Sequence, residues 1–283
     1  MEKLIIIDAN AYIHRVFHAL PTMLTYKGTQ INAVYGFVKL LFKFKKKIKP
    51  NYIVICFDYP AKYFRHEIYK DYKKNRLPSS KKLVGQIPII KEALEVLNIK
   101  SLELKGYEAD DLIATIVELT KNNNLQKIII TGDKDLLQLV NNNEVVVWND
   151  SQNTMYNSNK IKEKYGINPK QIIDVLALMG DIVDNIPGIK GIGKKTAIKL
   201  IKNFCTLENL FHNINIIKGK LNTLLHNGLE KSRLSKKLIE LNKNVPINIK
   251  IDDLKVKQLN LQKFLSFLEK YELYSFLKEF KKG

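Results

Sequence analysis

The chain has 283 residues, more than one compact core usually needs, so we expect two structural units or one large α/β core with a helical extension. Hydrophobic residues make up 45% of the chain and charged residues 27%, ordinary globular values that exclude an intrinsically disordered protein. Lys and Arg number 47 against 28 Asp and Glu, and the resulting formal charge of +19 predicts a polyanionic partner, most simply nucleic acid.

Short β-rich runs alternate with helical patterns through the first half of the chain. Strands are predicted at residues 3–8, 52–58, 101–104, 127–131 and 144–148. Helices are predicted at residues 33–47, 83–97, 109–121 and 134–139. This alternation indicates an α/β domain over residues 1–165, with a mainly parallel sheet covered by helices. A polar turn at 149–154 and the run around Tyr156 predict an edge hairpin.

The β pattern nearly disappears after about residue 157. The remaining sequence predicts helices at 158–165, 169–179 and 194–203, a helical series over 206–242, and a last helix at 261–280. We therefore expect a helical region over residues 166–283. No linker of low complexity separates it from the α/β domain.

Membrane and secretory features are missing from the sequence pattern. No apolar run approaches the ~18 residues that a membrane span requires, and the first such run stops at Asp8, too early for a secretory leader. Cys56 and Cys205 form no CxxC pair, so neither a disulfide framework nor a zinc ribbon is expected. These features predict a soluble, cytoplasmic protein without a membrane partner.

One stretch, residues 60–82, fits neither pattern. It interleaves basic and aromatic side chains and has too few aliphatic ones for a core. The side chains concerned are Tyr63, Phe64, Arg65, Tyr69, Tyr72, Lys73, Lys74 and Arg76. A connection of this length inside a compact domain is usually functional, and cations beside rings suit single-stranded nucleic acid. The alternative is a solvated, partly helical excursion.

Acidic residues are few beside the basic ones, and seven of them follow predicted strands. These acids are Asp8, Asp58, Glu108, Asp110, Asp111, Asp133 and Asp135. Because ligands of open parallel sheets bind outside the carboxyl ends of the strands, we expect these side chains to converge on one crevice. Asp181 and Asp184, in the loop after the helix that ends near residue 179, can close the crevice from the side.

So many carboxylates in one crevice repel one another unless protons or cations intervene. Hard oxygen ligands in this number select magnesium or manganese, and indicate two ions. Two divalent ions beside a basic surface suit in-line phosphodiester hydrolysis. Taken singly, each acid near Gly106 or Gly132 can instead cap a helix, although the full set would then require several coincidences.

A glycine-rich turn spans residues 185–197 and opens directly into a helix. Its residues of interest are Gly188, Gly191 and Gly193, followed by Lys194, Lys195 and Thr196 at the helix start. Backbone amides at a helix N-terminus bind anions, and the lysines add positive charge. The pattern is typical of a helix-hairpin-helix that holds duplex phosphates without reading bases. The alternative is a plain glycine-rich turn with solvated lysines.

Taken in order, these motifs resemble the bacterial 5′→3′ exonuclease and flap endonuclease family, and most closely the N-terminal 5′ nuclease domain of DNA polymerase I. The resemblance covers essentially the whole chain. It is carried by Asp8, Phe57-Asp58, Phe64-Arg65, the run from Tyr72 to Arg76, Gly106 to Asp111, Thr131 to Asp135, and Gly180 to Gly188. One departure is that Asp8 is followed by Ala9-Asn10, where Asp-Gly is frequent in the family.

The resemblance implies a PIN-like nuclease core with a helical arch at about 60–82, and a helix-three-turn-helix in a helical DNA-binding region over 166–283. It also implies two Mg²⁺ ions, for which Mn²⁺ can substitute. The implied ligands are Asp8, Asp58, Glu108 and Asp110 for one ion, and Asp133, Asp135, Asp184 and the shared Asp110 for the other, with Asp111 and Asp181 as outer ligands.

Roles for the arch and the hairpin are implied in the same way. Lys73 and Arg76 are expected to contact the scissile phosphate, and Tyr72 to stack on a base. Further DNA contacts are expected from Phe64, Arg65 and Lys74, and from the hairpin residues Gly188, Gly191, Gly193, Lys194, Lys195 and Thr196. The hairpin of this family commonly holds a K⁺ ion between carbonyls and a DNA phosphate.

The implied function is a structure-specific 5′→3′ exonuclease and 5′-flap endonuclease that removes flaps and RNA primer remnants in replication and repair. Its expected partners are DNA with a 5′ flap or nick and RNA–DNA primer junctions, on which it acts as a monomer at the nucleoid. Two alternatives stay open. A PIN-type RNase shares the acidic crevice but does not need the arch or the duplex-gripping hairpin. A catalytically inactive DNA-binding clamp gains nothing from acids that repel phosphate.

Overall fold

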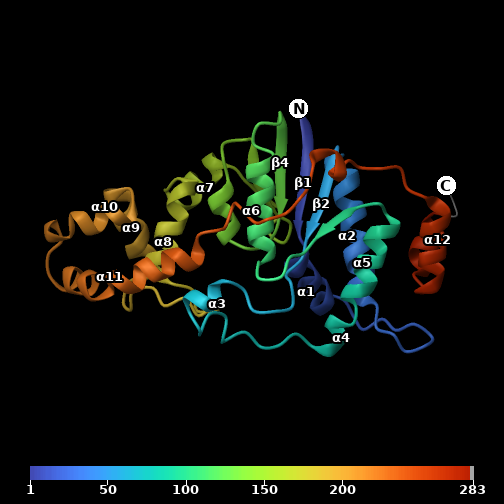
Figure 1. Ribbon diagram of the computed structural model, residues 1–283, viewed down its shortest axis with the longest axis horizontal. Helices are drawn as coiled ribbons and strands as arrows, with labels where there is room; N and C mark the ends of the chain where they lie inside the picture. Colours follow the sequence, from blue (N-terminus) through green and yellow to red (C-terminus); the bar gives the residue numbers. More distant parts are fainter. Residues whose placement is uncertain (281–283) are drawn as a thin grey trace.

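The computed structural model describes residues 1–280, and a six-stranded sheet forms its centre (Figure 1). The strands are β1 (Glu2–Asp8), β2 (Tyr52–Cys56), β3 (Lys100–Leu102), β4 (Leu125–Ile130), β5 (Val145–Asn149) and β6 (Thr154–Tyr156). Their order is β3-β2-β1-β4-β5-β6, with β1 to β5 parallel and β6 antiparallel to β5. The prediction of a mainly parallel sheet with an edge hairpin is confirmed.

Strand β1 lies between β2 and β4, and its apolar run Leu4–Ile7 is fully buried. A strand in this position is covered on both faces, which explains why its sequence is continuously apolar rather than alternating. Successive side chains point to opposite faces. Ile5 and Ile7 pack with α1 (Ala9–Ala19), α2 (Asn32–Ile48) and α5 (Ile87–Val96), whereas Leu4 and Ile6 pack with α6 (Ala109–Leu119) and η1 (Asp135–Leu139).

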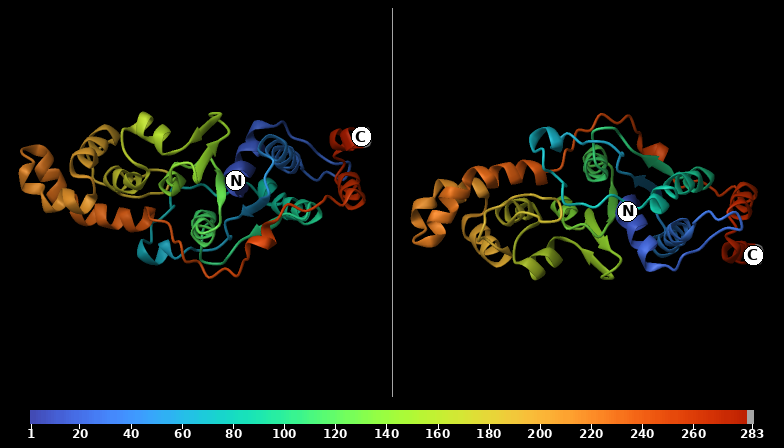
Figure 2. Two further views of the ribbon diagram at one scale, coloured as in Figure 1. Left: turned by 90° about the horizontal axis from the view of Figure 1, so that it is seen from above. Right: turned by 90° about the horizontal axis from the view of Figure 1, so that it is seen from below.

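The helical region extends from the sheet beside α6, as the views in Figure 2 show. Its elements are α7 (Ser158–Tyr165), η2 (Pro169–Gln171), α8 (Ile172–Met179), α9 (Lys194–Phe204), α10 (Leu207–His212), η3 (Ile214–Ile216) and α11 (Lys220–Ile239). Side chains of α8, α9 and α11 share one hydrophobic cluster with Leu4 and Ile6 of β1. The core is therefore continuous from the sheet into the helical region.

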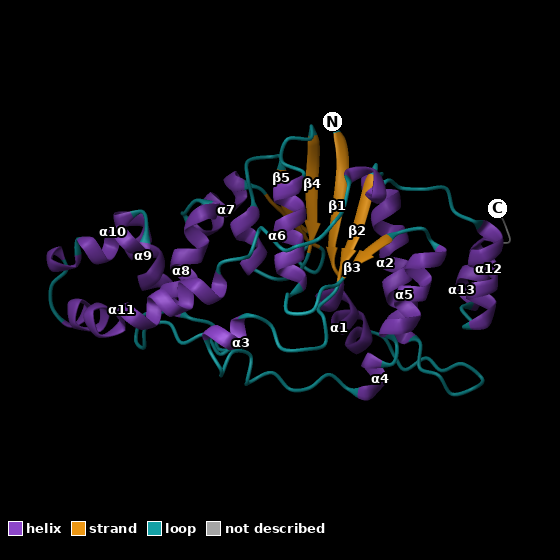
Figure 3. Cartoon of the chain, viewed as in Figure 1, coloured by secondary structure: helices purple, strands orange, loops and turns teal. Residues whose placement is uncertain are grey.

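The last helices correct one predicted boundary. After α11 the chain returns to the sheet through η4 (Ile251–Leu254), next to which Lys255 bridges to Tyr52 of β2. Helices α12 (Leu261–Lys270) and α13 (Tyr274–Phe280) then lie at the far end of the molecule, beside α2 and α5 (Figure 3). Phe264, Phe267 and Leu268 are buried there among core residues of the sheet's other face. Residues 251–280 thus belong to the α/β core and not to a helical region over 166–283.

The segment over residues 60–82 runs below the carboxyl ends of the strands, from α3 (Arg65–Ile68) to α4 (Lys81–Val84). Each of these helices has four residues, and the chain between them is made of turns and extended backbone. Its helical character is therefore confined to the two ends. Within the described part of the chain, every helix is too short or too polar to cross a membrane.

Candidate active site and nucleic-acid interface

A cleft of about 1140 Å³ opens at the carboxyl ends of the strands. Its lining includes seven predicted metal ligands and four lysine or arginine side chains. The predicted ligands are Asp8, Asp58, Asp110, Asp133, Asp135, Asp181 and Asp184, and the basic side chains are Lys73, Arg76, Lys91 and Lys134. The sheet thus brings together side chains that are up to 176 positions apart in the sequence, from Asp8 to Asp184. Two further predicted ligands, Glu108 and Asp111, do not line the cleft and are buried.

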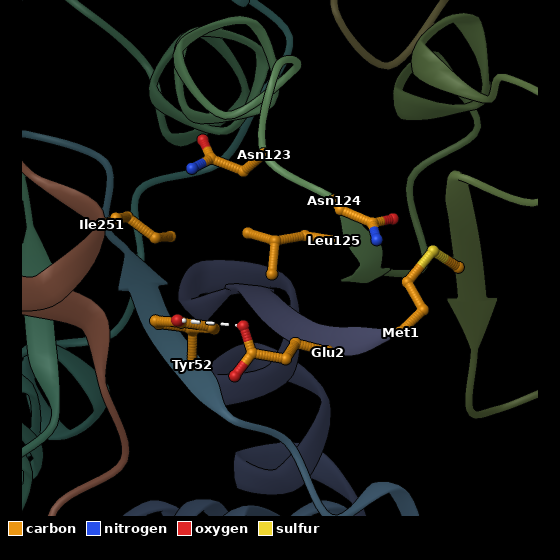
Figure 4. A pocket seen from close by; sticks show the side chains of 7 residues that line it. All are labelled: Met1, Glu2, Tyr52, Asn123, Asn124, Leu125 and Ile251. Atoms are coloured by element: carbon orange, nitrogen blue, oxygen red, sulfur yellow. Dashed lines mark hydrogen bonds between the residues drawn. The ribbon is translucent and has the colours of Figure 1, made fainter.

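The opposite end of the sheet has a different character. A cavity of about 390 Å³ lies there between the starts of β1, β2 and β4 (Figure 4). It contains one carboxylate, that of Glu2, which accepts a hydrogen bond of 3.2 Å from the Tyr52 hydroxyl. Charge is therefore concentrated at one end of the sheet, where the topology predicts the site.

Asp8 sits at the junction of β1 and α1, and both of its oxygens have partners. One accepts a hydrogen bond from the backbone amide of Ala11, and the other accepts one of 2.8 Å from the hydroxyl of Thr131. Burial, with the nearby charge of Asp58, raises the pKa of Asp8 to about 7. Asp8 is thus both a helix cap and a member of the acid cluster, so the two interpretations of this residue are compatible.

Asp58 is held by the first turns of two helices, α6 and α1. One of its oxygens accepts a hydrogen bond of 2.8 Å from the backbone amide of Ala109, and its own amide donates to the side chain of Asn10. Burial raises its pKa, although Lys73 opposes the shift. Asn10, two residues after Asp8, therefore has a structural role beside Asp58.

Asp110 and Asp135 have the most strongly shifted pKa values of the cleft acids. Burial, reinforced by the charge of Asp133, raises the pKa of both carboxyls well above the usual range. One oxygen of Asp135 is buried and has no hydrogen-bond partner. Buried polar atoms in native structures almost always have a partner, so this orphan oxygen points into a position that a cation would fill.

Three further acids, Glu108, Asp181 and Asp184, are paired with cations of the chain itself. Glu108 contacts Lys73 and lies 2.7 Å from the guanidinium of Arg65; despite burial, these two cations keep its pKa below the usual value. Asp181 is 2.6 Å from Lys134, which, against the effect of burial, likewise lowers its pKa.

Asp184 accepts hydrogen bonds of 2.8 and 2.5 Å from Arg76, and its second oxygen lies 3.8 Å from Lys73. Burial nevertheless raises its pKa, because desolvation exceeds the attraction of the two cations. Among residues 1–280, no three acidic, imidazole or thiol side chains converge, as they stand, on one point that could hold an ion. The donor set still fits hard divalent ions, since it is made of buried carboxylate oxygens and includes the orphan oxygen of Asp135.

Asp111 and Arg65 depart from the expected roles. Asp111 is fully buried, and both of its oxygens are bound by Arg65, at 2.6 and 2.8 Å, and by the backbone amides of Glu108 and Asn242. Arg65 is 1% exposed and directs its guanidinium inward. An outer-ligand role for Asp111 and a DNA contact for Arg65 are therefore wrong for this arrangement, because the two side chains neutralise each other inside the core.

Tyr72 is a third correction. Its side chain is buried in the hydrophobic cluster, and its hydroxyl donates a hydrogen bond of 3.1 Å to Glu108. A ring in this position is not available to stack on a base. Phe64 is half-buried with its ring next to that of Tyr107, while Lys74 is exposed and pairs with Asp71.

The glycine hairpin joins α8 to α9 by a close backbone approach. Gly188 has a φ of +55°, and a Cβ atom added to it would lie 2.3 Å from the backbone nitrogen of Gly180. Only glycine fits such a contact. The amide of Gly188 donates to the hydroxyl of Ser235 on α11, at 3.0 Å. The other predicted contact residues lie at the start of α9, namely Gly191, Gly193, Lys194, Lys195 and Thr196, all at least partly exposed.

Three residues near the acids received no role from the sequence. Thr131 holds Asp8 and accepts from the amide of Asp133, Asn10 supports Asp58, and Lys134 pairs with Asp181. The one sequence feature that could have indicated these roles is position, since each residue lies within three residues of a predicted ligand. Roles of this kind depend on which side chains meet across the sheet.

Known proteins match this chain along most of its length. The family described as 5′-3′ exonuclease, N-terminal resolvase-like domain, matches residues 3–166, and the 5′-3′ exonuclease, C-terminal SAM fold, matches residues 167–262. The chain belongs to the 5′-3′ exonuclease family. Members of this family are nucleases, and the predicted family and the predicted α/β nuclease core with a helical region are confirmed.

Two relatives show how family members differ in length. The chain is 42% identical over 279 residues to a 5′-3′ exonuclease of Aquifex aeolicus, covering 99% of this chain and 95% of that protein. It is 39% identical over 281 residues to DNA polymerase I of Caldicellulosiruptor bescii, covering 98% of this chain but only 33% of the polymerase. This family member thus corresponds to one third of that longer protein.

A solved structure has the same fold. The flap endonuclease of bacteriophage T5, in a complex with DNA and metal ions, superposes with a TM-score of 0.70 over 86% of this chain and 89% of that chain, at 22% sequence identity. Similarity at this level establishes the common architecture of the family.

Proposed function

We propose that the chain is a structure-specific 5′→3′ exonuclease and 5′-flap endonuclease that hydrolyses DNA phosphodiesters with two Mg²⁺ ions, for which Mn²⁺ can substitute. Its substrates are DNA with a 5′ flap or nick and RNA–DNA primer junctions, on which it acts as a monomer at the nucleoid during replication and repair. The observation that carries the proposal is the cleft, where buried carboxylates with raised pKa values lie next to the exposed arch and the basic hairpin.

Family membership and its relatives support this activity. A relative with 42% identity over nearly the same length is named a 5′-3′ exonuclease, and a protein of the same fold is named a flap endonuclease and was solved with DNA and metal ions. A K⁺ ion at the glycine hairpin is part of the proposal, with the turn between Gly188 and Gly193 as its site.

The residues that would hold the divalent ions are Asp8, Asp58, Asp110, Asp133 and Asp135 at the strand ends, completed by Glu108 and Asp184. Ions held there would supply Lewis acidity and would lower the pKa of a bound water, which is the chemistry that phosphodiester hydrolysis requires. Asp181, at the rim and paired with Lys134, is proposed as an outer ligand.

The chain's own cations have a separate task. Despite burial, the charges of Glu108 and Asp184 raise the pKa of Lys73, so its ammonium stays protonated at neutral pH. Lys73 and Arg76 lie at the rim of the acid cluster, where a scissile phosphate must pass. Their charges are placed to attract the phosphate and to stabilise the negative charge that develops during attack. Lys74 and Phe64 contact the strand beyond them.

In this proposal, the helical region binds the duplex part of the substrate. Amides at the start of α9, with Lys194, Lys195 and Thr196, can bind successive phosphates of one strand. Such contacts fix the register of the duplex without reading its sequence. The arch and hairpin together would thus place the junction of single and double strand at the acids.

A comparison of substrates tests this proposal against its rivals. We expect Mg²⁺-dependent cleavage of a 5′-flapped duplex and no cleavage of single-stranded RNA of the same sequence. Cleavage of the RNA at an equal or higher rate would favour a PIN-type RNase. Tight binding of the flap without cleavage of either substrate would favour an inactive clamp.

A blocked flap tests whether the arch admits a free 5′ end. Streptavidin bound to a 5′-biotin before the enzyme is added should strongly inhibit cleavage, because the bulky block cannot pass beneath residues 60–82. The same block added after the enzyme has bound is the control. Equal rates on blocked and free flaps would contradict threading.

A further inference from the structure

Arg65 is the largest fully buried side chain that carries a charge. Its Nε atom donates to the carbonyl of Leu238 at 2.7 Å, and Nη2 donates to the carbonyl of Glu240 at 3.1 Å. The same guanidinium binds Asp111 through two nitrogens and Glu108 at 2.7 Å. All of its nitrogens are thus used in directed hydrogen bonds, which is a geometry that only the planar fork of arginine provides.

These five bonds join three parts of the molecule. Arg65 itself begins α3, at the entry to the arch. Glu108, the N-cap of α6, contributes a carboxylate to the proposed metal centre. Leu238 and Glu240 are at the carboxyl end of α11, the helix on which the glycine hairpin packs.

Helix α11 also contacts the glycine hairpin, at a point one turn before the carbonyls that bind Arg65. The hydroxyl of Ser235 accepts from the amide of Gly188, and Gly228 lies against Ile189 so closely that a Cβ atom would meet its side chain at 2.6 Å. Because Ser235 is three residues before Leu238, one turn of a continuous helix separates the contact to the hairpin from the contact to Arg65. A shift of the hairpin on a duplex would therefore move the carbonyls that hold Arg65.

The hydrogen bonds of Glu108 allow a shift of Arg65 to change the orientation of its carboxylate. Arg65 binds its Oε2 atom, to which the Tyr72 hydroxyl also donates at 3.1 Å, while its Oε1 atom contacts Lys73 and lies 3.4 Å from the same hydroxyl. When Lys73 turns to a phosphate, Oε1 loses its cation, and Oε2 remains fixed by Arg65. The carboxylate then has one oxygen anchored and one free for an ion, so its orientation depends on where Arg65 is held.

We propose that Arg65 is a positioning residue that couples duplex binding at the glycine hairpin to the setting of Glu108 in the metal centre. The inference rests on the proposed function. It assigns Arg65 no contact with DNA and no contact with the reacting atoms. Coupling of this kind is reciprocal, so metal should tighten duplex binding by the factor by which duplex tightens metal binding.

Binding of a flapped duplex with CaCl₂ and with EDTA measures this coupling. In the unsubstituted protein, we expect Ca²⁺ to tighten binding about fivefold or more, which is the lower range of such couplings. In Arg65→Lys, which keeps the charge but loses the fork, the gain should fall to nearly one while the affinity in EDTA stays within about twofold. Arg233→Lys is the matched control and should keep the full gain, because Arg233 is an exposed arginine on α11 that pairs with Glu230.

A metal titration gives the second readout. The Mg²⁺ concentration for half-maximal single-turnover cleavage should rise about tenfold or more in Arg65→Lys, because partners that orient metal-binding side chains commonly contribute that much to metal affinity. Ser235→Ala tests the other end of the connection without disturbing any charge, and should reduce the Ca²⁺ gain even if Arg65→Lys does not fold.

The outcomes separate the two proposals. If the unsubstituted protein cleaves flaps and shows the gain, but Ser235→Ala and a folded Arg65→Lys keep it, the coupling role is refuted and the proposed function stands. The absence of any Ca²⁺ gain in the unsubstituted protein would also overturn the inference. If the unsubstituted protein does not cleave flaps under any divalent metal, the proposed function itself fails.

Discussion

The acids on the two walls of the cleft differ in whether side-chain cations are paired with them. On the strand-end wall, Asp8, Asp58, Asp110 and Asp135 have raised pKa values, first because they are buried and then because neighbouring acids repel them. On the wall made by the arch and the loop after α8, Lys73 and Arg76 pair with Glu108 and Asp184, and Asp181 pairs with Lys134 of the loop after β4.

The difference indicates that divalent ions bind at the strand-end wall, whereas the arch wall is neutralised by lysine and arginine side chains. Unmatched buried charge on the strand-end wall is costly and can be relieved by divalent ions. Paired charge on the arch wall is already relieved, so its lysine and arginine are held in place until a stronger anion, a phosphate, competes for them. The four predictions below test this division, beginning with the largest expected effect.

Removal of one strand-end carboxylate should abolish turnover. We expect Asp58→Asn to lower single-turnover flap cleavage by about 10³-fold or more, because a ligand of the metal centre is lost. Asp252→Asn, an exposed acid paired with Lys255 in η4, should cleave at the normal rate. Activity of Asp58→Asn within tenfold of the control would place the metal centre elsewhere.

Removal of an arch cation should slow chemistry rather than binding. Lys73→Ala should reduce the single-turnover rate by about 10²-fold, since its charge is needed where negative charge develops. The affinity for flapped duplex should change by no more than about twofold. Lys105→Ala, an exposed lysine outside the arch, is the control. A variant that binds DNA poorly but cleaves normally at saturation would contradict the division of roles.

Removal of hairpin charge should weaken binding of the duplex rather than slow the chemical step. Lys194→Ala with Lys195→Ala should weaken duplex binding and reduce the slope of log affinity against log salt by roughly 1 to 2, since each phosphate contact releases about one counterion. Lys257→Ala with Lys263→Ala removes the same charge from exposed positions at the far end of the molecule. An equal loss of slope in both double variants would show that only net charge matters.

The metal-free protein should become less stable as the pH rises from about 5 to about 8. Folding raises the pKa of Asp8 from 3.8 to about 7, so the folded state holds a proton that the unfolded state has released. Stability is therefore lost as the pH passes through the folded-state value, and Asp110 and Asp135 shift in the same direction. The lowered values of Glu108 and Asp181 affect stability only at lower pH. Thermal melting in EDTA across this range measures the effect, and a melting temperature that rises with pH would contradict it.

The same division separates what the sequence could predict from what it could not. Acids at strand ends were predictable because parallel topology alone places Asp8, Asp58 and Asp110 at one edge. The hairpin was predictable because its glycines are required locally, as the contact of Gly188 with Gly180 shows.

The failures arise from tertiary partners. The pattern around Arg65 and Tyr72 resembles a basic aromatic surface, yet Asp111 and two carbonyls of α11 draw Arg65 inward, and Glu108 draws the Tyr72 hydroxyl. Adjacency in sequence predicts that the last helices belong to the helical region. Phe264 and Phe267 pack instead on the other face of the sheet. No local periodicity contains that information.

The central claim is that the strand-end acids hold divalent ions, and thermal melting with and without Mg²⁺ tests it most directly. In EDTA, Asp135→Asn should melt at or above the temperature of the unsubstituted protein, because losing one buried carboxylate relieves repulsion. Millimolar Mg²⁺ should raise the melting temperature of the unsubstituted protein and have little effect on Asp135→Asn. A variant that is destabilised in EDTA and still stabilised by Mg²⁺ to the same extent would contradict the account.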